Sequence, residues 1–261
     1  MNFRTLIIIM FSVCFINSCQ VNNKEAHEQT PESYWKEQIK LYPDSFLLKE
    51  NLIQNYRDTG NLLKAIQITS LFLKTDSNNS KLWHIKGVLD FENEDTMQSS
   101  DAFRKAYLIN PNAIDAIYLA RILAYHKNAA CLDVCNEIVI KFGNNYQKEV
   151  YLIKGIYFSA IKDYDTALAL FDSSIHESYT YMDAYIQKAT TLMSTDKYED
   201  AIKVLSKATT VQNNFDDGYF YLGKCYEKIN DRTAAIDAYK KTILINRDYT
   251  DATEALSRLE K

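Results

Sequence analysis

The chain has 261 residues, and its formal net charge of −4 at pH 7 offers no basic surface for nucleic acid. Apolar residues make up 47% of the sequence, which is enough for a folded core, while six glycines and three prolines are few. Because glycine and proline are the residues that most often end or break helices, this composition favours an all-helical protein.

The first 31 residues differ from the rest of the chain. Residues 1–5 carry one arginine, and residues 6–16 form an uncharged, mostly apolar run that is too short to span a bilayer. The sequence Ile16-Asn17-Ser18-Cys19 follows and resembles a bacterial lipoprotein signal, in which the signal peptide is removed before a cysteine that receives lipid. The alternative is an ordinary secretory signal peptide with an incidental cysteine. We expect a signal peptide over residues 1–18, lipidation of Cys19 and a flexible tether over residues 19–31.

An internal period of 34 residues runs along the remainder of the chain. Gly87, Gly155, Ala189 and Gly223 lie on one ladder with this step, and Arg121 occupies the missing rung. Six units tile residues 46–249 without a gap, at 46–79, 80–113, 114–147, 148–181, 182–215 and 216–249. A fixed period of this length is typical of stacked structural repeats.

Other positions of the 34-residue unit carry the residue types of one known family. Position 4 is aromatic in four units, and position 20 is small in five. Position 24 is bulky at Phe103, Phe171, Leu205 and Tyr239. These positions together resemble the tetratricopeptide repeat, a helix–turn–helix unit of 34 residues. The resemblance implies an all-α, right-handed superhelical solenoid of about six units, in which positions 8 and 20 pack where the two helices cross.

Two units depart from this pattern, and two segments flank the array. Ile53 occupies position 8 of the first unit and Arg121 that of the third, where a small residue is expected. A two-residue shift in the second helix of unit three would place Cys131 and Cys135 on the packing face. We expect an N-terminal helix within residues 32–45 and a helix over residues 250–261 that caps the last unit.

Three cysteines remain in the expected mature chain. An odd number in an oxidising compartment can indicate a reactive thiol or an intermolecular disulfide. However, Cys131 and Cys135 are four residues apart on one helix, where disulfide geometry is poor. We therefore interpret these two residues and Cys225 as small buried hydrophobic residues.

The sequence lacks the motifs of common enzyme classes. It has no G-x-S-x-G, no H-E-x-x-H, no glycine-rich phosphate loop and no Cys-x-x-Cys. The four histidines, His27, His84, His126 and His176, lack the spacing of metal ligands. We expect neither catalysis nor a metal or other cofactor. The remaining alternative is a catalytic site that these motifs do not describe.

The resemblance also indicates which residues would meet a partner. In this family the concave face is lined chiefly by positions 2, 5, 9 and 12 of each first helix, and here these positions are apolar or aromatic in the middle of the array. The expected partner-binding residues are Val88, Phe91, Tyr118, Ile122, Tyr125, Leu152, Ile156, Ile186 and Phe220. Such a stripe would accept an apolar helix or an extended segment of a protein partner. Alternatively, the chain's own terminal helix or a tight superhelical curvature covers it.

Position 2 adds a row of acidic residues beside this stripe. The row consists of Asp115, Glu149, Asp183 and Asp217. If it takes part in binding, the partner should carry basic residues. Otherwise, each carboxylate merely stabilises the first turn of its helix through the helix dipole. The lysine and asparagine clamp with which some tetratricopeptide domains bind a C-terminal carboxylate is absent, because Glu50 and Gln54 stand at the positions concerned.

These patterns predict a lipid-anchored scaffold for protein–protein interactions. In size and layout the chain resembles repeat lipoproteins that serve type IV pilus assembly and outer-membrane protein insertion. This resemblance implies a role in assembling a complex of the bacterial envelope. Gln20 after the expected lipidation site favours the outer membrane. The alternative is an adaptor that recruits or regulates an envelope enzyme such as a peptidoglycan hydrolase.

Overall fold

The computed structural model describes residues 30–260, which form fourteen α-helices and one short 3-10 helix, with no strand among them. The expected signal peptide, the lipidation of Cys19 and most of the expected tether lie outside the described residues. The chain divides into two compact units after Leu52.

The first unit contains α1 (Pro31–Leu41) and the beginning of α2 (Phe46–Asp58). Thr30 caps α1, because its side chain accepts a hydrogen bond from the backbone N–H of Ser33 at 3.2 Å. Pro31 begins the helix at a position where no backbone donor is needed. No side chain of α1 is buried.

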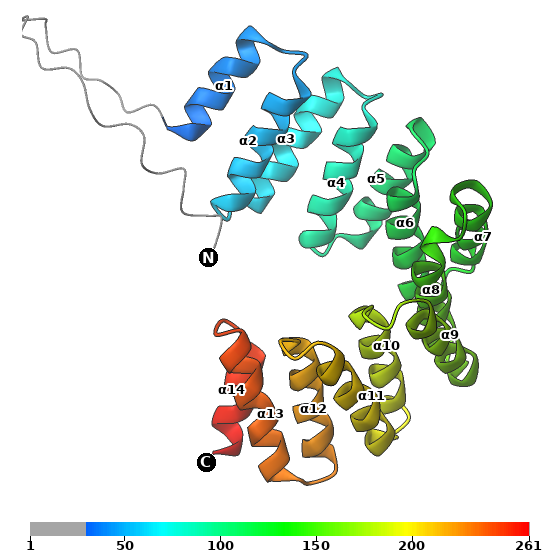
Figure 1. Cartoon of the computed structure of the whole chain (residues 1–261). Helices are drawn as coiled ribbons and strands as arrows, with labels where there is room; N and C mark the ends of the chain where they lie inside the picture. Colours follow the sequence, from blue (N-terminus) through cyan, green and yellow to red (C-terminus); the bar gives the residue numbers. More distant parts are fainter. Residues whose placement is uncertain (1–29, 261) are drawn as a thin grey trace, which may run out of the picture. The chain divides into compact units, whose positions relative to one another are not determined.

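The second unit is a series of antiparallel helices that follow one another along the chain (Figure 1). After the end of α2 the helices are α3 (Leu62–Thr75), α4 (Ser80–Glu92), α5 (Thr96–Ile109), α6 (Ala113–Tyr125), α7 (Ala130–Phe142), α8 (Gln147–Ala160), α9 (Tyr164–Glu177), α10 (Met182–Met193), α11 (Tyr198–Val211), α12 (Asp216–Lys228), α13 (Arg232–Ile245) and α14 (Thr250–Leu259), with η1 (Asn144–Tyr146) before α8. The second helix of each repeat begins at residue 62, 96, 130, 164, 198 or 232, a constant step of 34. The helix starts therefore carry the period seen in the sequence.

The turns inside the repeats also recur, and each contains a residue with left-handed backbone. These residues are Gly60, Glu94, Lys127, Lys162, Asp196 and Asn230. Three of the helices that follow begin after an aspartate, Asp95, Asp163 or Asp231, whose side chain accepts a hydrogen bond from the backbone N–H three residues later. In the third repeat the left-handed residue comes one position early, and α7 has no side-chain cap.

The third repeat packs its second helix differently, as the two-residue shift predicted. Cys131 and Cys135 are fully buried, whereas Asp133, at the regular packing position 20, is exposed. This confirms that the packing face of α7 is displaced along the sequence.

Where position 8 is glycine, the aromatic ring at position 24 packs against it, a contact that the expectation for positions 8 and 20 did not include. A Cβ atom on Gly87 would lie 2.9 Å from the ring of Phe103, and one on Gly155 would lie 2.5 Å from the ring of Phe171. The aromatic ring fills the crossing of the two helices and leaves no space for a side chain opposite it. Position 20 is also close to this crossing, because the hydroxyl of Ser99 donates a hydrogen bond to the carbonyl oxygen of Gly87 at 2.8 Å.

The first helices of repeats three to six form one layer. Helix α8 contacts both α6 and α10, and α10 contacts α12, whereas the second helices mainly contact the first helices next to them. At the end of the array α14 packs on α13 and contributes Ala252, which is fully buried. Among the described residues, no helix has the length and apolar character needed to cross a membrane.

Candidate functional site

The nine expected partner-binding residues differ in how far their side chains are exposed to solvent. Buried in the core are Ile122, Leu152, Ile156 and Phe220. Packed against the core and half-buried are Val88 and Ile186. Exposed by 37–49% are Phe91, Tyr118 and Tyr125. The continuous open stripe expected from the sequence is therefore interrupted at α8.

Polar side chains of α6 and α10 meet across α8 and account for this interruption. Nη2 of Arg121 lies 3.3 Å from Oδ2 of Asp183. Further along the same helices, Nε2 of Gln187 donates a hydrogen bond to the hydroxyl oxygen of Tyr125 at 2.9 Å. These contacts join repeats three and five, so the layer of first helices must curve toward them. The contacting side chains cover α8, the first helix of repeat four. Of the two ways in which the sequence allowed the stripe to be covered, tight superhelical curvature is therefore the one that applies at α8.

Arg121 is the centre of this polar bridge. It also donates a hydrogen bond from Nη2 to the hydroxyl of Tyr181 at 3.1 Å. Burial raises the pKa of Tyr181 to about 12, although the nearby charge of Arg121 acts in the opposite direction. Within the described residues, Nε of Arg121 and Oε2 of Glu149 are buried without a hydrogen-bond partner. The bridge therefore contains a neutral Tyr181 and an arginine whose Nε has no hydrogen-bond partner.

Only two of the four residues of the acidic row, Asp183 and Asp217, are exposed. Asp115 is only 2% exposed, and its Oδ1 lies 2.6 Å from Nδ1 of His84. Glu149 is half-buried, Asp183 is paired in the bridge, and Asp217 accepts a hydrogen bond from the hydroxyl of Tyr249 at 2.7 Å. All four lie in the first turn of a helix. This position fits the helix-dipole interpretation, and Asp115, Asp183 and Asp217 each have a partner within the chain.

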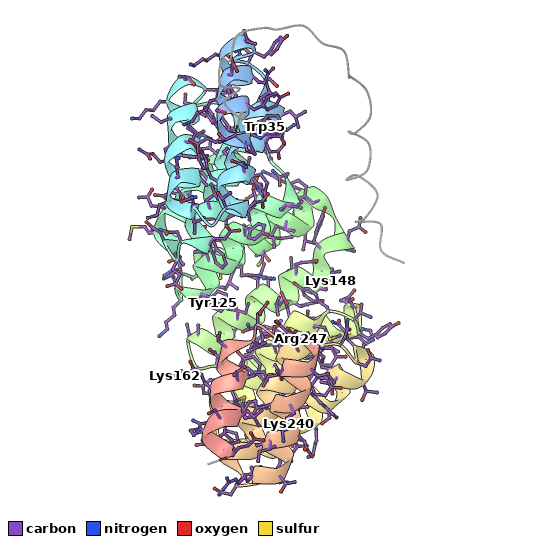
Figure 2. All side chains as sticks on the ribbon, turned by 90° about the vertical axis from the view of Figure 1, so that its left-hand side faces the viewer. Trp35, Tyr125, Lys148, Lys162, Lys240 and Arg247 are labelled. Atoms are coloured by element: carbon purple, nitrogen blue, oxygen red, sulfur yellow. The ribbon has the colours of Figure 1, made fainter. Side chains whose placement is uncertain are left out.

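The exposed residues Phe91, Tyr118 and Tyr125 form what we call the aromatic patch, on the neighbouring helices α4 and α6. The ring of Tyr118 stacks on buried Phe103, with centroids 4.7 Å apart and planes at 5°. His84 contacts both rings edge-on, and its hydrogen bond with Asp115 holds it in place. Tyr125, labelled in Figure 2, is fixed by its hydrogen bond from Gln187. Two of the three exposed rings are therefore held in fixed positions.

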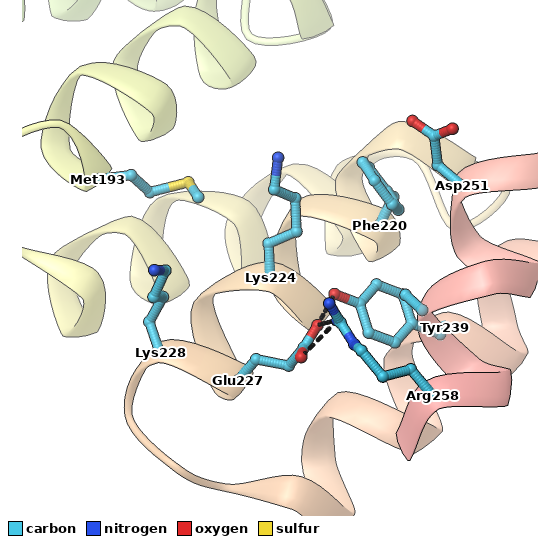
Figure 3. Close-up of a pocket in the computed structure, with 9 residues that line it drawn as sticks. Met193, Phe220, Lys224, Glu227, Lys228, Tyr239, Asp251 and Arg258 are labelled. Atoms are coloured by element: carbon cyan, nitrogen blue, oxygen red, sulfur yellow. Dashed lines mark hydrogen bonds and ion pairs between the residues drawn. The ribbon is translucent and has the colours of Figure 1, made fainter. Parts of the chain in front are cut away.

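A recess of about 390 Å³ lies at the C-terminal end of the array (Figure 3). Its lining residues are Met193, Phe220, Lys224, Glu227, Lys228, Tyr239, Asp251, Ala255 and Arg258. Glu227 accepts a hydrogen bond from the Tyr239 hydroxyl at 2.5 Å and is paired with Arg258 at 2.7 Å. Sequence reasoning identified only Phe220 here, because the recess is formed only when α14 packs beside α12 and α13.

Comparison with known proteins agrees with this architecture. A family model described as "Tetratricopeptide repeat" matches residues 183–215 and 217–249, which coincide with the fifth and sixth units. Residues 183–249 therefore consist of two tetratricopeptide repeats, and the chain has the fold of a tetratricopeptide solenoid. Proteins of this family are generally non-enzymatic scaffolds for protein–protein interactions. The expected all-α tetratricopeptide solenoid is thereby confirmed.

Solved structures of other tetratricopeptide-repeat proteins share the fold at low sequence identity. A tetratricopeptide repeat protein from Parabacteroides merdae is 17% identical, with a TM-score of 0.72 over 88% of this chain and 91% of that one. PilW, a type IV pilus biogenesis factor, is 19% identical, with a TM-score of 0.61 over 82% of this chain and 97% of that one. TTC0263 from Thermus thermophilus is 13% identical, with a TM-score of 0.59 over 69% and 98%. No curated protein sequence matches the chain.

The three described cysteines of this tetratricopeptide-repeat protein are free and buried. Burial raises the pKa of Cys131 to about 11 and those of Cys135 and Cys225 to about 12. The thiols are therefore protonated at neutral pH, which agrees with their interpretation as small buried hydrophobic residues. Among residues 30–260, no group of three or more histidine, cysteine or acidic side chains is placed to hold a metal ion.

Proposed function

We propose that this tetratricopeptide-repeat protein is a lipid-anchored scaffold that binds a protein partner through its aromatic patch and helps to assemble a complex of the bacterial envelope. The observation that carries the proposal is the patch itself. Exposed aromatic rings held in place by buried neighbours supply large contact areas, and little conformational freedom is lost when they bind. Phe103 and His84 provide this support for Tyr118.

The proposed partner presents an apolar segment, such as one side of a helix or an extended strand. Phe91, Tyr118 and Tyr125 can contact such a segment directly, because they are the exposed members of the expected binding set. Basic residues are not part of the proposal, since three of the four acidic-row residues, Asp115, Asp183 and Asp217, already have partners within the chain.

The envelope location rests on the N-terminal sequence. The short apolar run before Ser18-Cys19 favours a lipoprotein, and two or more acyl chains would anchor the protein stably, since each buried methylene contributes about 0.8 kcal/mol. Gln20 favours the outer membrane. The similar fold of PilW, a type IV pilus biogenesis factor, adds support for a role in assembly, although at this identity the likeness extends to the fold alone.

The proposal is tested by affinity capture from solubilised membranes with wild-type protein and with a Phe91→Ser, Tyr118→Ala double variant that retains its helical circular dichroism. Truncation of buried aromatic anchors often costs 2 kcal/mol or more, so we expect about a 30-fold weaker capture of the partner. The matched control replaces two exposed apolar residues of second helices, Leu108→Ala and Ile140→Ala, and should capture normally.

The identity of the captured proteins distinguishes the two functions considered. Secretin or barrel subunits would support assembly of an envelope complex. A peptidoglycan hydrolase would favour the adaptor function instead. Equal capture by wild type and patch variant would exclude the aromatic patch as the binding site.

A further inference from the structure

We propose that the C-terminal recess is a second docking site, which binds an acidic segment of a protein partner. In this proposal Lys224 and Lys228 hold side-chain carboxylates of the segment, and an apolar residue between those carboxylates lies against Met193 and Phe220. The site is separate from the aromatic patch and does not depend on it, since the recess belongs to α10, α12, α13 and α14.

The charges of the recess are not balanced within the chain. Three lining residues are cations and two are anions. Glu227 is neutralised by Arg258, whose Nη2 lies 2.8 and 2.7 Å from the two carboxylate oxygens, and it also accepts the hydrogen bond from Tyr239. The remaining charges are Lys224 and Lys228 against Asp251. The recess therefore carries an excess of positive charge.

The two lysines are placed to act together. They lie four residues apart, so their side chains project from the same side of α12 (Figure 3). Within residues 30–260 neither forms an ion pair; Nζ of Lys224 contacts only aromatic rings, at 5.5 Å from the centroid of Phe220 and 5.3 Å from that of Tyr221. Such contacts orient an ammonium group without neutralising it. Both ammonium groups remain available for carboxylates.

Asp251 does not cancel this charge. It lies in the first turn of α14, where the helix dipole favours a carboxylate. Figure 3 shows it beyond Phe220, on the side of the recess opposite Lys228. An incoming carboxylate can therefore approach Lys228 without meeting Asp251.

The walls of the recess define the apolar part of the ligand. Phe220 is held by Tyr249 and Tyr239, with ring centroids 4.8 and 5.9 Å away. Met193 is half-buried and points toward the lysines, and a methionine side chain adapts readily to the shape of a ligand. A basic segment would be repelled by the unpaired lysines, and a wholly apolar one would leave them without partners. An acidic segment with one apolar residue satisfies both surfaces.

The test uses random peptides of about twelve residues, displayed with the C-terminus fused to the carrier so that no terminal carboxylate is free. They are selected on the full chain, purified in detergent. We expect the recovered peptides to carry at least two acidic residues around an apolar one. Selected peptides, made as free amides, should bind a Lys224→Gln, Lys228→Gln variant at least tenfold more weakly, and binding should weaken as salt rises from ~50 to ~500 mM.

Two controls make the result specific. A Lys74→Gln, Lys207→Gln variant loses the same two charges at exposed positions elsewhere and should bind like wild type. The Phe91→Ser, Tyr118→Ala variant should also bind normally, so that a failure of the aromatic patch remains distinguishable from a failure of this site. Selection of no peptides or of non-acidic peptides, equal binding to the Lys224→Gln, Lys228→Gln variant, or a strong preference for a free C-terminal carboxylate would each overturn the proposal.

Discussion

Arg121 and Asp183 form an ion pair between the third and fifth repeats, with Nη2 and Oδ2 3.3 Å apart. Arg121 occupies position 8, which is glycine or alanine in the four ladder repeats. The third repeat accommodates the arginine because its position 24 is Glu137, so no aromatic ring presses on the backbone of α6. The fully buried small residues of this helix are Ala120 and Ala124 instead. An apparent defect of the repeat pattern is therefore a contact that closes part of the concave face.

Replacement of Arg121 by methionine should destabilise the protein. The variant keeps much of the side-chain length but loses the ion pair with Asp183 and the hydrogen bond to Tyr181. A hydrogen bond that involves a charged group contributes about 1.5–3 kcal/mol, but the partial exposure of Arg121 places the expected loss nearer to 1 kcal/mol. Urea unfolding of the wild type and the Arg121→Met variant measures this loss of stability. A double-mutant cycle with Tyr181→Phe should give a coupling energy above about 0.5 kcal/mol, and a value of zero would contradict the bridge.

Gly155→Ala should also destabilise, although alanine normally stabilises a helix interior by about 0.5–1 kcal/mol relative to glycine. The added Cβ would lie 2.5 Å from the ring of Phe171. Overpacking of this kind costs about 1–3 kcal/mol, so the clash should outweigh the helical gain. Thermal and urea unfolding measure whether Gly155→Ala lowers or raises the free energy of unfolding. The control Ala169→Leu, at an exposed position of α9, should change stability by less than about 0.5 kcal/mol, and a more stable Gly155→Ala variant would refute the close crossing.

Stability should fall at alkaline pH because of the buried thiols. Burial raises the pKa of Cys131 from 9.0 to about 11 and that of Cys135 to about 12. Unfolded thiols release their protons near pH 9, whereas the folded state retains them. The stabilising contribution is therefore complete below pH 9 and is lost as pH rises toward 11–12. Urea unfolding across this range tests the sign, and a Cys131→Ala, Cys135→Ala variant should show a shallower decline.

Removal of the expected lipidation site should release the protein from the membrane. We expect a Cys19→Ser variant to leave the membrane pellet when cells are fractionated, because the acyl chains would supply the anchor. Recovery of this variant in the pellet at the wild-type level would show that the protein is not held by lipid on Cys19. A Cys225→Ser variant serves as the matched control and should remain in the pellet, since Cys225 is buried in the array.

The sequence alone determined the repeat architecture of this protein. Close helix crossings place glycine opposite an aromatic ring in the repeats of Gly87, Gly155 and Gly223, so the packing imposes a 34-residue period on the sequence. The starts of the second helices follow the same period. Even the displaced packing of Cys131 and Cys135 could be predicted, because apolar periodicity is local.

Only the tertiary structure decided which of the expected binding residues are accessible. Leu152 and Ile156 are apolar residues at repeat positions that line the concave face in this family. They are nevertheless buried, because side chains of α6 and α10 meet above them. The recess of Lys224 and Lys228 likewise depends on how α14 packs at the end of the array. Curvature and end packing arise from contacts between residues 31 to 62 positions apart, and a 34-residue pattern carries no information about such contacts.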